Sequence, residues 1–91
     1  MRSARMRITG RVQGVGYRAW ALQVASRLGL RGWVRNRTDG SVEALVIGED
    51  DAVARMIEAC RAGPFGARVS DVAISNAEDD GSAGFGAKPT L

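Results

Sequence analysis

Hydrophobic residues alternate with polar ones over residues 5–12, and the spacing changes after a short glycine-rich stretch. Alternation with a period of two is typical of a strand with one buried face. One parity carries Met6, Ile8, Gly10 and Val12, and the other carries Arg5, Arg7, Thr9 and Arg11. We expect residues 1–5 to form no regular secondary structure. From Arg18 to Leu28 apolar residues recur at helical spacing, which predicts a helix that Gly29 ends.

A second strand is predicted over Leu30–Thr38 and a third over Val42–Gly48. The Asp-Gly pair in Thr38–Ser41 is a strong hairpin signal between them. In the second strand Asn36 shares the parity of Val34, so it points to the face that a helix would cover. A buried amide without a partner costs roughly 1–3 kcal/mol. The side-chain amide of Asn36 therefore either forms hydrogen bonds within a turn at the strand end or has a functional role.

The remaining pattern predicts one more helix and two more strands. Three acids, Glu49 to Asp51, begin the helix, and Gly63-Pro64 stops it. Its apolar stripe consists of Val53, Met56, Ile57 and Cys60. A fourth strand is predicted over 67–75, with Val69 out of phase, followed by a solvated acidic turn at 78–82. Phe85 and Ala87 indicate a short last strand that Pro89 restricts to an edge.

The order β-α-β-β-α-β predicts an α+β fold, the split βαβ or ferredoxin-like sandwich, as a single domain over residues 1–91. In this fold two helices cover one face of an antiparallel sheet and the other face stays open. The segment around Phe85 adds a possible short C-terminal strand. Many unrelated functions use this fold, so function has to be argued from a site.

Composition excludes several kinds of chemistry. The chain has no histidine, which excludes histidine bases and histidine metal ligands, and Cys60 is its only cysteine. We therefore expect no metal site and no cofactor. The net charge is +3, and nearly all of the positive charge is arginine, with Lys88 the only lysine. No apolar run approaches the length of a membrane span and the basic N-terminus lacks an apolar signal core, so we expect no membrane partner and a cytoplasmic location. Nothing in the sequence demands more than a monomer, and we expect one.

The stretch Gly10–Arg18 is the strongest candidate site. A strand that turns through glycines into a helix directs several amides and the positive end of the helix dipole at one point, which suits an anion. Arg18 adds a forked guanidinium that matches phosphate oxygens. On these residues alone, an ordinary strand-to-helix turn with a solvated arginine fits as well.

Two stretches carry a resemblance to a known family. The first is residues 8–18, Ile-Thr-Gly-Arg-Val-Gln-Gly-Val-Gly-Tyr-Arg, and the second is Gly32-Trp33-Val34-Arg35-Asn36, followed by Gly40, Val42 and Gly48. The first resembles the phosphate-cradle signature of the acylphosphatase family, with Tyr17 where the pattern more often has Phe or Met, and the second matches the family's spacing. The resemblance extends over essentially the whole chain. The segment Gly84–Ala87 is poorer in strand-forming residues than the family pattern leads us to expect.

The resemblance implies metal-independent hydrolysis of a small acyl phosphate to a carboxylate and inorganic phosphate, with phosphate also acting as an inhibitor. It implies that Arg18 binds phosphate and that Asn36 positions the attacking water. The implied phosphate-binding residues are Gln13, Gly14, Val15, Gly16, Tyr17 and Arg18.

Two other hypotheses stay open. The first is a non-catalytic phosphate- or RNA-binding ferredoxin-like module that uses a basic sheet face. RNA-binding sheets stack bases on two or three aromatic residues, whereas only Trp33 is obvious here, so we expect no nucleic-acid partner. The second is an acyl- or carbamoyl-phosphate-binding module of a larger carbamoyl-transfer enzyme. The short chain, which ends at Leu91, favours a stand-alone domain over that module.

Overall fold

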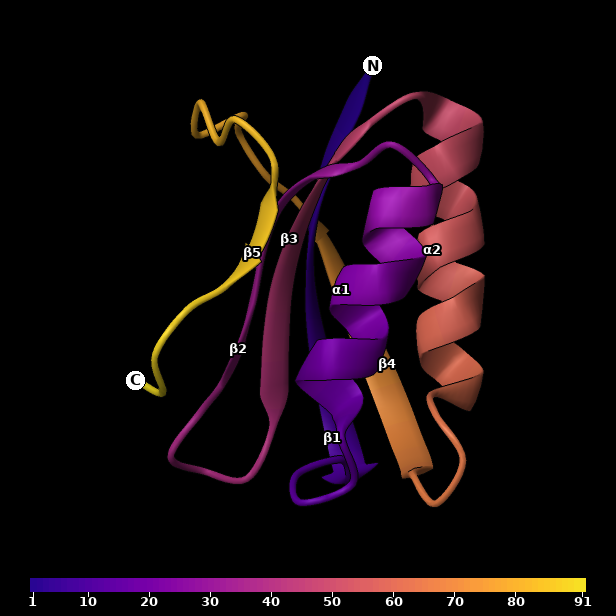
Figure 1. Cartoon of the computed structure of the whole chain (residues 1–91), viewed down its shortest axis with the longest axis vertical. Helices are drawn as coiled ribbons and strands as arrows, with labels where there is room; N and C mark the ends of the chain where they lie inside the picture. Colours follow the sequence, from indigo (N-terminus) through magenta and orange to yellow (C-terminus); the bar gives the residue numbers. More distant parts are fainter.

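The strands of this protein form one sheet whose order is β4-β1-β3-β2-β5, in a computed structural model that describes residues 1–91. In chain order the elements are β1 (Arg2–Arg11), α1 (Tyr17–Arg27), β2 (Arg31–Asn36), β3 (Val42–Gly48), α2 (Asp50–Ala62), β4 (Arg68–Asn76) and β5 (Phe85–Ala87). Both helices cover the same face of the sheet (Figure 1). The ferredoxin-like arrangement with a short extra strand is thus confirmed. Neither helix is long and apolar enough to cross a membrane.

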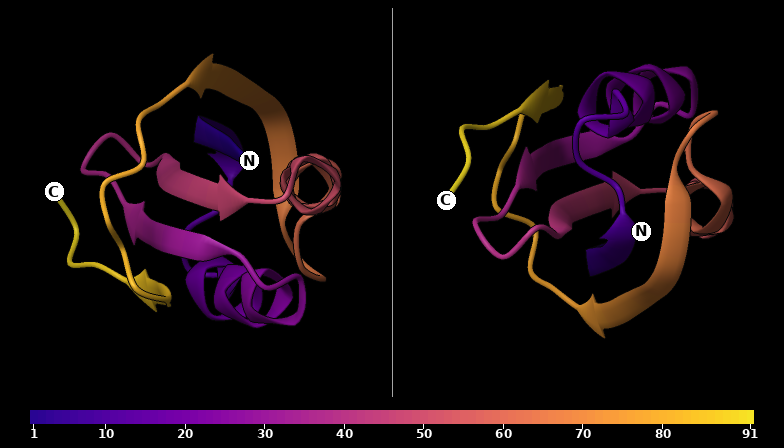
Figure 2. Two further views of the ribbon diagram at one scale, coloured as in Figure 1. Left: turned by 90° about the horizontal axis from the view of Figure 1, so that it is seen from above. Right: turned by 90° about the horizontal axis from the view of Figure 1, so that it is seen from below.

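The sheet is mixed, which corrects the predicted antiparallel arrangement at one strand. Strands β1 to β4 pair antiparallel, whereas β5 pairs parallel with β2, Gly32 opposite Phe85. The cause is the crossing of residues 77–84 from the β4 edge to the β2 edge (Figure 2). Strand β4 ends at the end of the sheet where β2 begins, so the chain enters β5 in the direction of β2.

The first strand begins earlier than its alternation predicts. Residues 2–5 are strand rather than irregular chain, because they pair with β3 from Arg2 opposite Gly48 onward.

A second difference from the sequence pattern concerns Val69. The β1–β4 register shifts between Thr9 and Gly10, so that Thr9 lies opposite Asp71 and Gly10 opposite Val69. This bulge turns Val69 toward the same core as Val72, which explains why the sequence pattern is out of phase there.

The main core lies between the sheet and the two helices. It contains 17 buried residues, among them Met6 and Ile8 from β1 and Val34 from β2. The predicted apolar stripe of α2 is confirmed, since Val53, Met56, Ile57 and Cys60 are all buried. Burial on the helix side is therefore what fixes the register of β1 and β2, and with it the side to which Asn36 points.

The opposite face of the sheet is partly covered by the acidic segment 77–82. Trp33 is only 7% exposed, and its indole nitrogen donates to Asp80 at 3.1 Å. Arg35 lies over its ring at 4.8 Å and Lys88 at 4.9 Å. Asp79 pairs with Arg31. The segment is thus tied to the sheet rather than simply solvated, and the predicted open face is open only in part.

We predict that the Asp79–Arg31 pair makes stability depend on acid pH. The hydrogen bond from Arg31, helped by the amide of Gly81, lowers the pKa of Asp79 from its ordinary 3.8 to about 2. A carboxyl group whose pKa is lowered by folding stabilises the folded state above its unfolded pKa and loses that effect as the pH falls. In urea titrations, Asp79→Asn should be less stable than the parent at neutral pH. The difference should disappear between about pH 4 and pH 2.

Glu78→Gln is the matched control, because Glu78 lies in the same exposed segment and makes no ion pair. It should track the parent across the whole pH range. A stability difference for Asp79→Asn that persists unchanged at pH 2 would contradict the assignment.

Candidate active site

The loop between β1 and α1 turns through two glycines in the left-handed region. Gly14 has φ of 76° and Gly16, the N-cap of α1, has φ of 77°. A Cβ at either position would meet no atom within 4 Å, so the backbone conformation, rather than space, requires glycine. The two glycines therefore give residues 13–18 a tight turn that ends at the first turn of a helix.

The backbone N–H groups of this loop are free of partners within the protein. None of the amides of residues 13–19 donates to a backbone or side-chain acceptor of the chain. The first turn of α1 contains no acidic residue and no side-chain cap that would occupy these donors. Unpaired amides at a helix N-terminus form an anion-binding arrangement, because the helix dipole adds to their partial positive charge.

Side chains that pack against the main core hold the loop in place. Val12 is fully buried, and Val15 packs against the main core. Tyr17 is buried as well, and its hydroxyl donates to the carbonyl oxygen of Cys60 at 2.7 Å, which ties the start of α1 to the end of α2. Burial raises the pKa of Tyr17 well above its ordinary value. Neither Val15 nor Tyr17 has a side chain free to bind a ligand, so only their backbone amides are available.

Gln13 anchors the loop to the neighbouring hairpin. Its side-chain amide nitrogen donates to the carbonyl oxygens of Arg37 and Ser41, at 2.8 and 2.9 Å. Ser41 is itself held by Asp39, whose carboxylate accepts hydrogen bonds from the Ser41 amide and hydroxyl. The Gln13 side chain thus sets where the loop stands relative to the end of β2. Sequence reasoning did not find this role, because the partners are backbone carbonyls more than 20 residues away.

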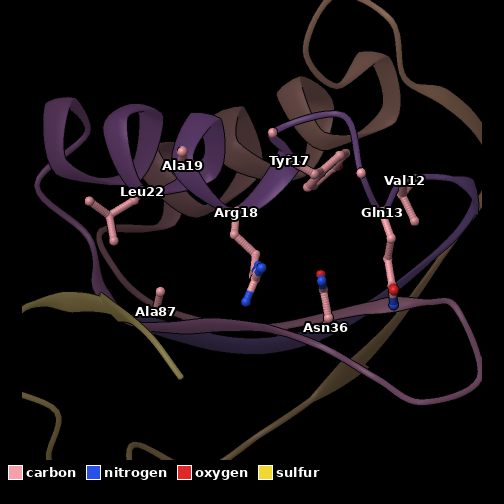
Figure 3. Close-up of a pocket in the computed structure, with 10 residues that line it drawn as sticks. Val12, Gln13, Tyr17, Arg18, Ala19, Leu22, Asn36 and Ala87 are labelled. Atoms are coloured by element: carbon pink, nitrogen blue, oxygen red, sulfur yellow. The ribbon is translucent and has the colours of Figure 1, made fainter. Parts of the chain in front are cut away.

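Arg18 and Asn36 line the same pocket, as the parity of β2 predicts. The pocket has a volume of about 350 Å³. The side chain of Arg18 extends from α1 toward the sheet, and that of Asn36 points from β2 toward the helix (Figure 3). Arg18 takes part in none of the ion pairs of the protein. Its guanidinium is thus available to an anion within reach of the loop amides.

The backbone of Asn36 is hydrogen-bonded within the protein, whereas its side chain is not. Asn36 pairs with Val42 of β3, and its carbonyl oxygen accepts a hydrogen bond from the Leu91 amide at 3.2 Å. Its side-chain amide makes no hydrogen bond within the protein. The explanation that a local turn satisfies Asn36 is therefore wrong. The side chain faces the pocket with its carbonyl and NH₂ groups free to hold a water or a ligand.

The predicted residues account for part of the pocket wall. Gln13, Gly14, Gly16, Tyr17, Arg18 and Asn36 line it, and Val15 does not. Three small or apolar residues that sequence reasoning did not single out for the site, Ala19, Leu22 and Ala87, line it as well. The sequence did contain a signal for Leu22, because a residue four positions after Arg18 lies on the same face of the helix. Ala87 carried no such signal, because its position depends on the parallel pairing of β5.

Comparison with known proteins identifies the family. The acylphosphatase family model matches residues 4–87. An acylphosphatase of Rhodospirillum rubrum is 50% identical over 91 residues, all of both chains, and one of Rhizobium meliloti is 55% identical over 92% of this chain and 90% of its own. The crystal structure of the Bacillus subtilis acylphosphatase superposes with a TM-score of 0.93 at 35% identity, with 97% and 99% of the two chains covered. This chain belongs to the acylphosphatase family.

We predict that Gln13→Met weakens catalysis although the side chain keeps its size. The variant loses both hydrogen bonds to the hairpin, a stability cost of about 1–3 kcal/mol. A loop displaced by a fraction of an ångström should lower kcat/KM for acetyl phosphate roughly 10- to 100-fold. Steady-state kinetics and thermal unfolding measure the two effects.

Gln23→Met is the control, since Gln23 is exposed on α1 and lines no part of the pocket. It should keep the parent's kcat/KM. If Gln13→Met also keeps it, the bridge to the hairpin does not position the loop.

Proposed function

We propose that Arg18, the loop amides and Asn36 together form the catalytic site of an acylphosphatase. Membership of the family makes the chain an enzyme that hydrolyses acyl phosphates to a carboxylate and inorganic phosphate. The observation that carries the assignment of residues is the shared pocket, into which an unpaired arginine and an unpaired carboxamide both point beside a row of unpaired amides.

In this proposal the phosphoryl group binds in the loop. The amides of residues 13–18 donate to its oxygens, and Arg18 adds two donors in a planar fork. Phosphoryl transfer depends mainly on positioning and on stabilising the charge on the equatorial oxygens. Preorganised amides and one guanidinium supply both, which is why the proposed mechanism uses no metal ion. The tight turn at Gly14 and Gly16 keeps these donors in place before the substrate arrives.

Asn36 positions the water. Its side-chain carbonyl accepts a hydrogen bond from the water, and its NH₂ donates to the water or to a phosphoryl oxygen. The water oxygen attacks phosphorus directly, the bond between phosphorus and the bridging oxygen breaks, and the carboxylate leaves with the electron pair. No phosphoenzyme forms on this route. A carboxylate is a good leaving group, so the step requires little acid catalysis.

The water's proton passes to the substrate's own phosphate. A carboxamide is not basic enough to accept it, and no carboxylate, histidine or free thiol lines the pocket. The phosphoryl oxygens are the nearest basic atoms in this arrangement. Inorganic phosphate, the product, keeps the interactions with the loop and Arg18, so we expect it to inhibit competitively.

We further propose a cytoplasmic monomer, a single domain over residues 1–91, with no nucleic-acid partner. Burial of Trp33 under the acidic segment supports the last point, because the one aromatic ring on that face has no surface on which a base could stack. The large exposed apolar residues come from separate segments, which supports a monomer. They are Met1, Phe65, Ile74 and Leu91.

We predict that Arg18→Ala nearly abolishes turnover and weakens inhibition by phosphate. Loss of a transition-state arginine in phosphoryl transfer costs about 10³-fold or more. Hydrolysis of acetyl phosphate with EDTA present, with phosphate as the inhibitor, measures both effects. Arg27→Ala, at the exposed end of the same helix, is the control and should match the parent. Substantial turnover in Arg18→Ala would contradict the assigned role.

For Asn36→Ala we predict a different pattern. Its kcat should fall on the order of 100-fold, because the water is no longer oriented. The inhibition constant of phosphate should change only slightly, because Asn36 acts mainly on the water. Asn76→Ala, exposed at the end of β4, serves as the control. Near-normal kcat in Asn36→Ala would refute the water-positioning role.

A further inference from the structure

The pocket has two chemically different ends. One end consists of the loop, with Gly14 and Gly16, together with Asn36. The other end consists of Ala19, Leu22 and Ala87, which are apolar and belong to α1 and β5. In Figure 3 the side chain of Arg18 lies between them, with Leu22 and Ala87 on one side and Asn36 on the other. A volume of about 350 Å³ is large enough for a small organic ligand rather than a phosphate ion alone.

The topology places both apolar residues on the side away from the loop. Helix α1 leads away from the loop, so Leu22 lies one turn beyond Arg18. Strand β2 runs the opposite way and reaches the loop end at Asn36, while Ala87 pairs with Val34, two residues earlier. Leu22 and Ala87 therefore both line the part of the pocket that lies between α1 and the edge strand β5.

In-line displacement then decides where the acyl group lies. The attacking and leaving oxygens stand on opposite sides of phosphorus. With the water on the Asn36 side, the bridging oxygen and the acyl carbon lie on the side away from Asn36, and Leu22 and Ala87 lie on that side of Arg18 (Figure 3). This step rests on the proposed function, because it takes the position of the water from it.

The apolar end of the pocket contains no charge besides Arg18. Lys88, although adjacent to Ala87, has its ammonium group over Trp33 on the opposite face of the sheet. Leu22 is half-buried and is not among the residues that pack on the main core. An acyl group that carried a second phosphate or carboxylate would lose solvation here without gaining a partner.

We propose that Ala19, Leu22 and Ala87 form an acyl subsite, and that this protein prefers acyl phosphates with an uncharged, apolar acyl group, aryl or alkyl. Alanines on two sides leave room for a ring, and Leu22 supplies the one large apolar surface. Ala19 and Ala87 are exposed, so the subsite does not sterically exclude large acyl groups. It favours a substrate in proportion to the apolar surface that the acyl group brings into contact with the subsite.

The test compares benzoyl phosphate with acetyl phosphate, as the ratio of their kcat/KM values. In Leu22→Asn this ratio should fall about tenfold, the lower end of what an apolar contact contributes to specificity. Acetyl phosphate should lose less than benzoyl phosphate, because its methyl group has less surface to contact. Ala87→Glu, on a different element and at an exposed position, should lower the ratio as well, because it adds charge to the subsite.

Leu22→Met should keep the parent's ratio, and Gln23→Ala, outside the pocket, should keep both activities. A ratio that is unchanged in both Leu22→Asn and Ala87→Glu, while acetyl phosphate is still hydrolysed in an Arg18-dependent way, overturns the acyl subsite and leaves the proposed function standing. Absence of Arg18-dependent hydrolysis of either substrate in the folded parent protein overturns both.

Discussion

The proposed site depends most on a row of backbone amides that have no acceptor inside the protein. Leaving N–H groups unpaired is unfavourable unless they are solvated or meet a ligand, so proteins seldom gather many of them in one turn. Here the left-handed glycines at 14 and 16 make the turn, and the start of α1 adds its own unpaired amides. The side chains of Val12, Val15 and Tyr17 point inward and hold the loop in this conformation. The free amides are thus a consequence of packing elsewhere.

The ferredoxin-like frame brings the second half of the site to this loop. The loop and the β2–β3 hairpin lie at the same end of the sheet (Figure 1), and Gln13 joins them through two hydrogen bonds. The parity of β2, set by burial of Val34 against the helices, turns Asn36 toward the pocket. Arg18 and Asn36, which are 18 residues apart in the sequence, thereby line one pocket. In the proposed mechanism they act on one phosphoryl group without any histidine, metal ligand or reactive thiol.

Much of this arrangement follows from local patterns. Alternation in β1 and β2, the helical stripe Val53–Cys60 and the Asp-Gly hairpin each predict an element that the structure contains. The parity of Asn36 predicts its meeting with Arg18. What the patterns missed depends on long-range geometry. The bulge opposite Gly10 reverses the apparent phase of Val69, and the crossing of residues 77–84 makes β5 parallel. The same crossing brings Ala87 to the pocket and Asp79 and Asp80 to the sheet, which no local signal records.

The central claim is that a water held by Asn36 attacks phosphorus while the loop and Arg18 hold the phosphoryl group. Hydrolysis of acetyl phosphate in ¹⁸O-labelled water under single-turnover conditions, with uncatalysed hydrolysis subtracted, tests it most directly. The account predicts one labelled oxygen in the inorganic phosphate and none in the acetate. Label in the acetate would mean that water attacks the acyl carbon. Unlabelled phosphate released in a first turnover from the enzyme would point to another nucleophile, and either result would contradict the account.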